Sequence, residues 1–409
     1  MKKKIIWIIL LITILGGSGY YYFKNIYIPK LTIEDEKINI NNLYIYGTHL
    51  NLEGKVNNKD NLKLVLYNGD FKEINTNYED DNFNLSRYIN DGLYLDNIPR
   101  GKYYMFMRSG NEDDYKYYAL NNTTEYPNTT YYTSSKINNK IVIQNEESYP
   151  TMIMNVEKNK DDNIYDVVID PGHGGMDSGA LNNKYRESSF TMDIALGIKK
   201  KLENSGLKVK LTREKDQLGK DELLEEYGPS GRAVIPHNVH AKYLFSIHIN
   251  SNPYRQANGL EIYTAKNINY DFAKTLTKNI IRSTGLNYST NRNYKIFNGI
   301  YSRNFSNNDI IESRKEKKNK NLQPYDISKD SNYFYIIRET GGIVTGAFVD
   351  DRNKKILGNP YVKTNVGIES YLLELGFISN NSDLKKLINN PNSYIDSISN
   401  SIIDLYNNK

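Results

Sequence analysis

The chain has 409 residues, of which 39% are hydrophobic, and carries a formal net charge of +5 at pH 7. This length favours two domains, and the hydrophobic fraction is enough for buried cores. The positive charge is mild, and Lys and Arg do not cluster with aromatic residues as they do in nucleic-acid grooves, so no nucleic-acid partner is predicted. There is no cysteine, which excludes disulfides, a thiolate nucleophile and cysteine-ligated metal sites.

The chain begins with a basic and then an apolar segment. Lysines at positions 2–4 precede a stretch from Ile5 to Phe23 that carries no charge. At roughly 1.5 Å per residue, a helix of this length nearly crosses the ~30 Å hydrocarbon layer, and the basic start predicts a cytoplasmic N-terminus. We expect residues 1–30 to form a membrane anchor with its linker. A cleaved signal peptide is the alternative, although no A-x-A site is present; both place the rest of the chain outside the cytoplasm.

Residues 31–155 are predicted to form a small β-sandwich-like domain. Short, partly alternating segments such as NLYIY, NLKLVLYN, KYYMFMR and KIVIQN are separated by turn sequences such as NNKD and PRGK, a pattern typical of such folds. The domain contains no cluster of chemically useful residues, and its one histidine, His49, is isolated. We therefore expect it to act as a spacer or a binding module, dispensable for chemistry.

Residues 160–409 carry the pattern of an α/β domain. DVVID, YLFSIHI, GLEIYT and ESYLLELGF have the composition of strands, and segments 188–206, 271–283 and 391–408 have helical periodicity. Strands that alternate with helices predict a largely parallel sheet flanked by helices. The polar segment 304–330 is predicted to be a mobile insertion.

Four residues that can bind a metal or transfer protons map to the carboxyl edge of this predicted sheet, where ligands of open α/β sheets gather. His173 follows DVVID, His248 ends YLFSIH, Glu374 lies late in ESYLLELGF, and Glu187 precedes a helix. Two imidazoles and one carboxylate form a catalytic zinc set that leaves a position for water. The glycines around His173 allow a sharp turn and leave room for a bulky substrate. Glu374 is the candidate general base, an unligated carboxylate that takes a proton from water.

Each residue also has an ordinary structural interpretation. His173 could cap a turn, and His248 could be a hydrogen-bonded core histidine. Glu187 could be an acid in the first turn of a helix. Glu374 differs from the others, because a carboxylate inside an apolar strand is unfavourable unless it is paired or coordinated. The four residues together are far less expected by chance than any one of them.

The motifs as a set resemble a known enzyme family. DPGHGGMDSGA, followed by Glu187, SIHINS and LLELGFISN, resemble the zinc-dependent N-acetylmuramoyl-L-alanine amidases of the amidase 3 family over about residues 164–408. The resemblance implies that His173, Glu187 and His248 bind Zn²⁺ and that Glu374 is catalytic. It also implies the reaction, which is hydrolysis of the amide bond between the lactyl group of N-acetylmuramic acid and L-alanine in peptidoglycan.

Combined with the anchor, the resemblance predicts a membrane-anchored autolysin whose catalytic domain faces the cell wall. Two other functions stay open. One is an exported zinc hydrolase of another class, such as a peptidase or deacetylase, that acts on the wall. The other is a wall-binding scaffold, for which a broken ligand set would be expected. His237 and His240 are predicted to be surface or supporting residues.

Overall fold

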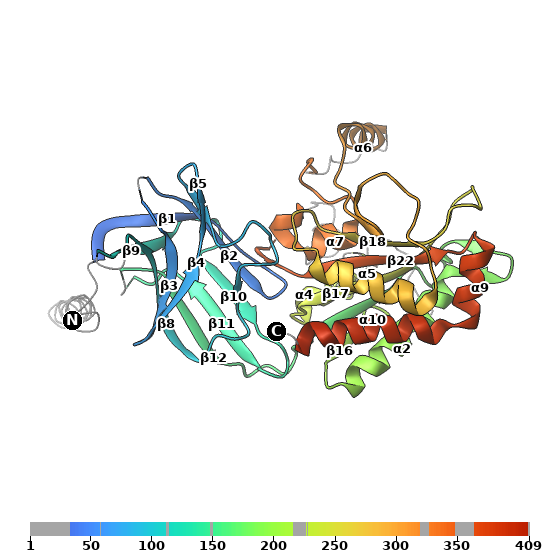
Figure 1. Cartoon of the computed structure of the whole chain (residues 1–409), viewed down its shortest axis with the longest axis horizontal. Helices are drawn as coiled ribbons and strands as arrows, with labels where there is room; N and C mark the ends of the chain where they lie inside the picture. Colours follow the sequence, from blue (N-terminus) through green and yellow to red (C-terminus); the bar gives the residue numbers. More distant parts are fainter. Residues whose placement is uncertain are drawn as a thin grey trace, which may run out of the picture.

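The computed structural model describes residues 33–57, 59–111, 114–147, 150–215, 226, 228–319, 327–347 and 364–407. These residues form an all-β body and an α/β body that pack side by side (Figure 1). The predicted anchor, residues 1–30, lies outside the described residues. Within the described ranges, no helix is both long and apolar enough to cross a membrane.

The first body is all-β, as predicted. Its strands are β1 (Ile33–Tyr46), β2 (His49–Lys55), β3 (Lys63–Tyr67), β4 (Phe71–Asn75), β5 (Asn77–Glu79), β6 (Asn82–Asn84), β7 (Leu93–Tyr94), β8 (Gly101–Ser109), β9 (Lys116–Asn122), β10 (Asn128–Tyr132), β11 (Asn139–Gln144) and β12 (Ile153–Lys158). Alternate residues of β2, β3 and β8 face one core, as the two-residue period of a strand requires: Leu50, Leu52, Leu64, Leu66, Met105 and Met107.

These strands form one branched sheet, in the order β10-β11-β12-β8-β9-β1-β2-β6-β5, whereas the sequence predicts a sandwich, in which two sheets are separate. The strands form one sheet because β8 is long enough to pair with two different strands along its length. Its first half, Gly101–Tyr104, pairs with β12, and its second half, Phe106–Ser109, pairs with β9. Hydrogen bonds therefore connect strands that a sandwich would divide between two sheets.

The second body is the predicted α/β domain. Its sheet strands are β13 (Val167–Pro171), β16 (Val209–Leu211), β17 (Tyr243–Asn250), β18 (Leu260–Thr264), β19 (Lys295–Phe297), β20 (Ile300–Tyr301) and β22 (Glu369–Phe377); β14 (Leu181–Asn182) and β15 (Tyr185–Arg186) form a separate hairpin. Its helices are α2 (Glu187–Asn204), α4 (Ile235–Asn238), α5 (Asp271–Thr284), α6 (Asn307–Asn319), α7 (Tyr335–Thr340), the 3₁₀ helix η2 (Gly342–Thr345), α9 (Asn381–Asn389) and α10 (Pro391–Asn407).

The sheet, in the order β16-β13-β17-β22-β18-β20-β19, is mixed rather than largely parallel. The first four strands are parallel, but β18 runs antiparallel to β22. Only the helix-free residues 251–259 separate β17 from β18, and a parallel return needs a longer crossover. The segment predicted as a mobile insertion contains α6, and its residues 320–326 lie outside the described ranges.

The predicted helices at 188–206, 271–283 and 391–408 are α2, α5 and α10, and α10 packs against both α2 and α5 (Figure 1). α2 buries one face at the predicted helical spacing, formed by Ile194, Ala195, Ile198 and Leu202. These helices cover the sheet whose strands β17 and β22 carry His248 and Glu374.

The two bodies share backbone and side-chain hydrogen bonds. β21 (Val366–Gly367), which lies just before β22, pairs with Ile45 and Tyr46 of β1. The ring of Tyr46 packs in the α/β core. Asp166 precedes β13, and its carboxylate accepts hydrogen bonds from the N–H and hydroxyl of Ser135 at 2.7 and 2.6 Å. The β domain therefore contacts the amino ends of the parallel strands, opposite their carboxyl edge.

Replacing Asp166 by Ala tests this interface. The side chain is buried and also accepts a hydrogen bond from the N–H of Lys208 at 2.8 Å. Because an unsatisfied buried donor costs about 1–3 kcal/mol, we expect Asp166→Ala to lower the free energy of unfolding by roughly 2–4 kcal/mol in urea titrations. The exposed Asp162 is the control, and Asp162→Ala should change stability by less than about 0.5 kcal/mol. Equal stability of the two variants would contradict the interface.

Candidate metal centre

The glycine-rich loop after β13 is held firmly in place. His173 has a left-handed backbone, with φ of 59°. Two buried arginines bind the carbonyl oxygens of the loop: Arg213 donates to those of Pro171 and Gly172, both at 3.0 Å, and Arg232 donates to that of His173 at 2.6 Å. Gly174 and Gly175, which follow, also have positive φ, of 128° and 55°. Glycine therefore permits the sharp turn, and the two guanidinium groups fix it.

A buried ion pair joins this loop to the strands beside it. Arg232 lies 2.6 Å from the carboxylate of Asp170, which also accepts hydrogen bonds from Ser246 at 2.6 Å and from Thr212 at 2.5 Å. Burial alone would raise the pKa of Asp170, but the positive charge of Arg232 and the hydroxyl donors outweigh it and lower that pKa. The carboxylate is therefore ionised at neutral pH and ties β13 to β17.

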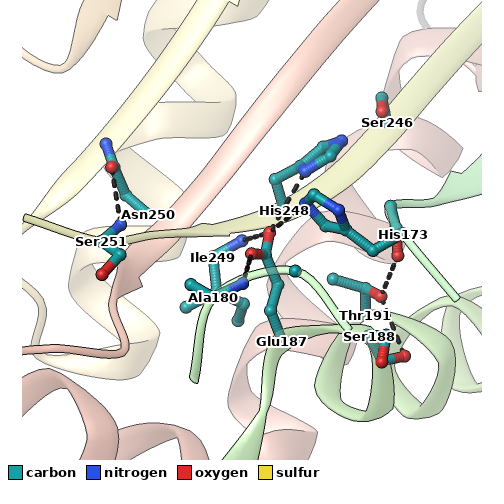
Figure 2. Close-up of polar contacts among 12 residues, drawn as sticks. His173, Ala180, Glu187, Ser188, Thr191, Ser246, His248, Ile249, Asn250 and Ser251 are labelled. Atoms are coloured by element: carbon teal, nitrogen blue, oxygen red, sulfur yellow. Dashed lines mark hydrogen bonds and ion pairs between the residues drawn. The ribbon is translucent and has the colours of Figure 1, made fainter. Parts of the chain in front are cut away.

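The structure brings the three predicted metal ligands together. The ligand atoms of His173, Glu187 and His248 all lie within 4.8 Å of one another. Oε1 of Glu187 is 3.1 Å from Nε2 of His173 and 3.2 Å from Nδ1 of His248 (Figure 2). The three side chains come from the loop after β13, the first residue of α2 and the end of β17, as expected for the carboxyl edge of the sheet.

Backbone amides complete the environment of Glu187. Its Oε1 accepts a hydrogen bond from the N–H of Ile249, and its Oε2 accepts one from that of Ala180, both at 2.9 Å (Figure 2). Burial would raise the pKa of Glu187, but the hydrogen bonds to His173 and His248 outweigh it and lower the pKa well below its usual range. Glu187 is therefore a buried, ionised carboxylate and not a solvent-exposed helix acid.

Two loop glycines make room for this cluster. A Cβ atom at Gly172 would lie 2.5 Å from the ring of His248, and a Cβ at Gly179 would lie 2.6 Å from Oε2 of Glu187. Both distances are shorter than real contacts of a Cβ atom. The sequence suggested that the glycines leave room for a substrate, whereas these two leave room for the side chains of the cluster itself.

Asp177 is a neighbour of the cluster that the sequence reasoning missed. Its Oδ2 lies 2.6 Å from Nδ1 of His173, and its Oδ1 accepts a hydrogen bond from the N–H of Gly179 at 2.9 Å. This contact orients the imidazole and leaves its Nε2 directed at Glu187, as second partners of metal-binding histidines do. The available signal was an aspartate four residues after His173 in the same loop.

Glu374 lies beside the cluster on β22. It is the register partner of His248 on the adjacent parallel strand, so the two side chains leave the same face of the sheet. Burial raises the pKa of Glu374 well above its usual range, and the negative charges of Glu187 and Glu261 raise it further. Its Oε2 is buried and has no hydrogen-bond partner among the described residues. The carboxyl group of Glu374 therefore has a buried oxygen, Oε2, that no described protein group hydrogen-bonds.

Glu261 was also missed by the sequence reasoning. It is the register partner of Glu374 on β18 and is buried. Its carboxylate accepts hydrogen bonds from three side chains, those of Asn250, Tyr263 and Ser289, at 3.1, 2.8 and 2.6 Å. Glu261 thus differs from Glu374, because its oxygens are already engaged.

His237 and His240 do not belong to the His-Glu-His cluster. His237 is partly exposed; desolvation of its ring lowers its pKa to about 4, and its Nε2 lies 3.3 Å from the carbonyl oxygen of Glu339. The ring of His240 stacks on Tyr132 of the β domain, with 4.0 Å between centroids. His240 therefore lies at the domain boundary, and His237 and His240 both line a cleft there.

Comparison with known proteins gives the family. The sequence profile of the N-acetylmuramoyl-L-alanine amidase family, amidase 3, matches residues 167–404, which is more than half of the chain. The chain belongs to this family. The match begins at β13 and ends within α10, so it contains the whole cluster and Glu374.

Among individual relatives, the N-acetylmuramoyl-L-alanine amidase LytC of Bacillus subtilis is 33% identical over 132 residues, which are 32% of this chain and 24% of LytC. A germination-specific N-acetylmuramoyl-L-alanine amidase of the same organism is 29% identical over 143 residues, covering 33% of this chain and 59% of the relative. The chain thus spans less than two thirds of either protein. The catalytic domain of the amidase CwlV from Bacillus (Paenibacillus) polymyxa var. colistinus aligns with 60% of this chain and 100% of its own, at 25% identity and a TM-score of 0.39.

Replacing Asp177 by Ala tests the orientation of His173. Loss of such an outer partner commonly weakens metal binding by about 10–100-fold, and we expect a loss in this range when Zn²⁺ affinity is measured by competition with a chromophoric chelator. Asp193 is exposed on α2, and Asp193→Ala should bind Zn²⁺ like the parent. Unchanged affinity in Asp177→Ala would show that Asp177 does not support a metal ligand.

Proposed function

We propose that the protein is a zinc-dependent N-acetylmuramoyl-L-alanine amidase that hydrolyses the bond between the lactyl group of N-acetylmuramic acid and L-alanine in peptidoglycan. The observation that carries the proposal is the convergence of His173, Glu187 and His248 beside Glu374, in a chain of the amidase family.

The donor set suits zinc. Two imidazole nitrogens and one carboxylate oxygen are a common set of protein ligands in catalytic zinc sites, and they leave a position for water or substrate. His173, Glu187 and His248 would hold the ion, and Asp177 would keep the ring of His173 in position. When bound there, Zn²⁺ supplies Lewis-acid chemistry, which lowers the pKa of a water molecule and polarises a carbonyl group.

Glu374 is proposed to move the proton. As a carboxylate it takes a proton from the attacking water, and as a carboxylic acid it returns that proton to the nitrogen of the departing L-alanine. The raised pKa of Glu374 favours holding a proton between these two steps. Its register pairing with His248 supports this role, because the two side chains leave the same face of the sheet.

Two alternatives have weaker support. A zinc hydrolase of another class could use the same donor set, but the family match favours an amidase. A wall-binding scaffold would not need an intact His-Glu-His cluster with an unsatisfied carboxyl group next to it. Product analysis separates the two enzyme classes, because only an amidase frees a peptide that begins with L-alanine.

The proposal predicts that metal ligands and the proton carrier can be separated by mutation. His173→Ala, Glu187→Ala and His248→Ala should each lose zinc and activity together, because three protein ligands leave no spare. Glu374→Gln keeps its shape but cannot carry a proton. It should keep roughly one zinc per chain and lose about 10²–10⁴-fold in turnover of soluble muropeptides. Zinc content and turnover are measured on the same folded samples.

His49→Ala, in β2, is the histidine control and should keep both metal and turnover. If Glu374→Gln loses zinc, Glu374 is a ligand instead of the proton carrier. If Glu374→Gln retains zinc and near-normal turnover, the proposed role of Glu374 is wrong, although the metal site would stand.

We also propose that the protein is held in the cell membrane by residues 1–30, with the catalytic domain facing the wall. The lysines at positions 2–4 and the uncharged stretch that follows support this orientation. Protease added to intact cells stripped of their wall should then digest residues 31–409, because they would face the medium. Full protection of these residues in intact cells, with digestion after lysis, would contradict the orientation.

A further inference from the structure

A cleft of about 770 Å³ lies at the boundary of the two domains. One wall is formed by β10 with Lys140 of β11. The other is formed by residues of the segments 229–241, which contains α4, and 364–368; α4 and β10 face each other across the boundary in Figure 1. Its volume is within the usual range of ligand sites, about 300–1,000 Å³, which occur preferentially at domain interfaces.

The wall formed by the β domain is polar. Along β10, Thr129 and Tyr131 are buried, whereas Asn128, Thr130 and Tyr132 alternate with them on the more exposed face. All three of these more exposed residues line the cleft. Lys140 is the register partner of Tyr132, so its side chain leaves the same face of the sheet. An amide, a hydroxyl, a phenol and an ammonium group therefore form one continuous strip.

The opposite wall adds rings and further polar groups. The ring of His240 stacks on Tyr132, with 4.0 Å between centroids, which joins the two walls at one end. Pro236 and Asn238 line the cleft on this side, and Tyr126 lines it on the side of the β domain. The combination of flat rings with amides and hydroxyls suits a ligand that has apolar ring faces and many hydroxyl groups.

The small number of charged side chains in the cleft argues against a basic peptide or a nucleic acid as its ligand. Among the described residues that line it there is no Asp or Glu, and Lys140 is the one Lys or Arg. None of the lining residues offers a carboxylate to a basic peptide, with Glu157 lying beside Lys140 outside the lining, and nucleic acid would need several cations. Lys140 lies 4.0 Å from Glu157, in a partly exposed pair of the kind that contributes little to stability. Its ammonium group can therefore pair with a single carboxylate on a ligand.

The cleft is separate from the metal centre. It contains Ala241, Gly367 and Ile368, which come just before β17 and β22, whereas His248 and Glu374 lie near the other ends of these strands. At ~3.3 Å per residue, the five residues from Tyr243 to His248 span about 17 Å. A ligand in the cleft would therefore leave the metal centre free.

We propose that the interdomain cleft binds a segment of peptidoglycan glycan from which the peptide has been removed, with Tyr132 contacting a sugar ring and Lys140 pairing with a lactyl carboxylate. The inference rests on the proposed function, because hydrolysis of the amide converts the lactyl amide of the glycan into this carboxylate. The protein would then hold the product strand at one edge of its catalytic sheet while the metal centre acts on a neighbouring peptide.

Isothermal titration of the full chain tests the proposal. The probe is a synthetic peptide-free tetrasaccharide of alternating N-acetylglucosamine and N-acetylmuramic acid, and the comparison is chitotetraose, which has the same length but no carboxylate. We expect Lys140→Ala and Tyr132→Ala each to weaken binding of the probe at least about tenfold, as truncation of a central contact does. Chitotetraose should bind more weakly than the probe, and Lys140→Ala should not change its affinity.

Two surface residues of β4 provide matched controls. Lys72→Ala and Phe71→Ala remove an exposed ammonium group and an exposed ring outside the cleft, and they should bind the probe like the parent. If Tyr132→Ala unfolds, the Lys140→Ala result decides the proposal. No binding of the probe, equal binding of chitotetraose, or unchanged affinity in Lys140→Ala would overturn it. The titration needs no turnover, so failure of the proposed amidase activity would appear separately, as intact muropeptides in the assay.

Discussion

The fold around the metal centre depends on the buried carboxylate of Glu187. Burying this charge is unfavourable unless donors surround it, and here two imidazoles and the N–H groups of Ala180 and Ile249 do so. Because these donors come from different segments, the loop after β13, the start of α2 and the end of β17 must all be in place together. Arg213 and Arg232 fix the loop after β13 by donating hydrogen bonds to its carbonyl oxygens. Hydrogen bonds within the protein therefore hold the side chain of Glu187 between the two histidines.

Much of this centre could be predicted from the sequence, because its residues lie at the ends of strands with clear hydrophobic patterns. Position along DVVID and YLFSIH was enough to place His173 and His248 at one edge. The supporting contacts could not be predicted in the same way. Asp177 lies in a loop whose path depends on left-handed residues, and the pairing of Glu261 with Glu374 depends on which strand neighbours β22. The antiparallel direction of β18 was missed for the same reason, since strand order is set by tertiary packing and not by local pattern.

The β domain makes more contacts with the catalytic domain than the prediction of a spacer implied. Its β1 pairs with β21, and the strand that follows, β22, carries Glu374. Tyr46 of β1 is part of the α/β core, and Asp166 is bound by Ser135. A flexible spacer would not need these contacts. They hold the β domain at the amino ends of the parallel strands, so the domain can shape a second surface without entering the metal centre.

Mass analysis of the products from a soluble muropeptide, incubated with the full chain, tests the central claim most directly. The account predicts two products, a peptide with a free L-alanine amino group and a saccharide with a free lactyl carboxylate. Both should disappear when a chelator removes the metal and return when Zn²⁺ is added back. Cleavage inside the peptide, loss of an acetyl group, or the same products in the presence of the chelator would contradict a zinc-dependent amidase.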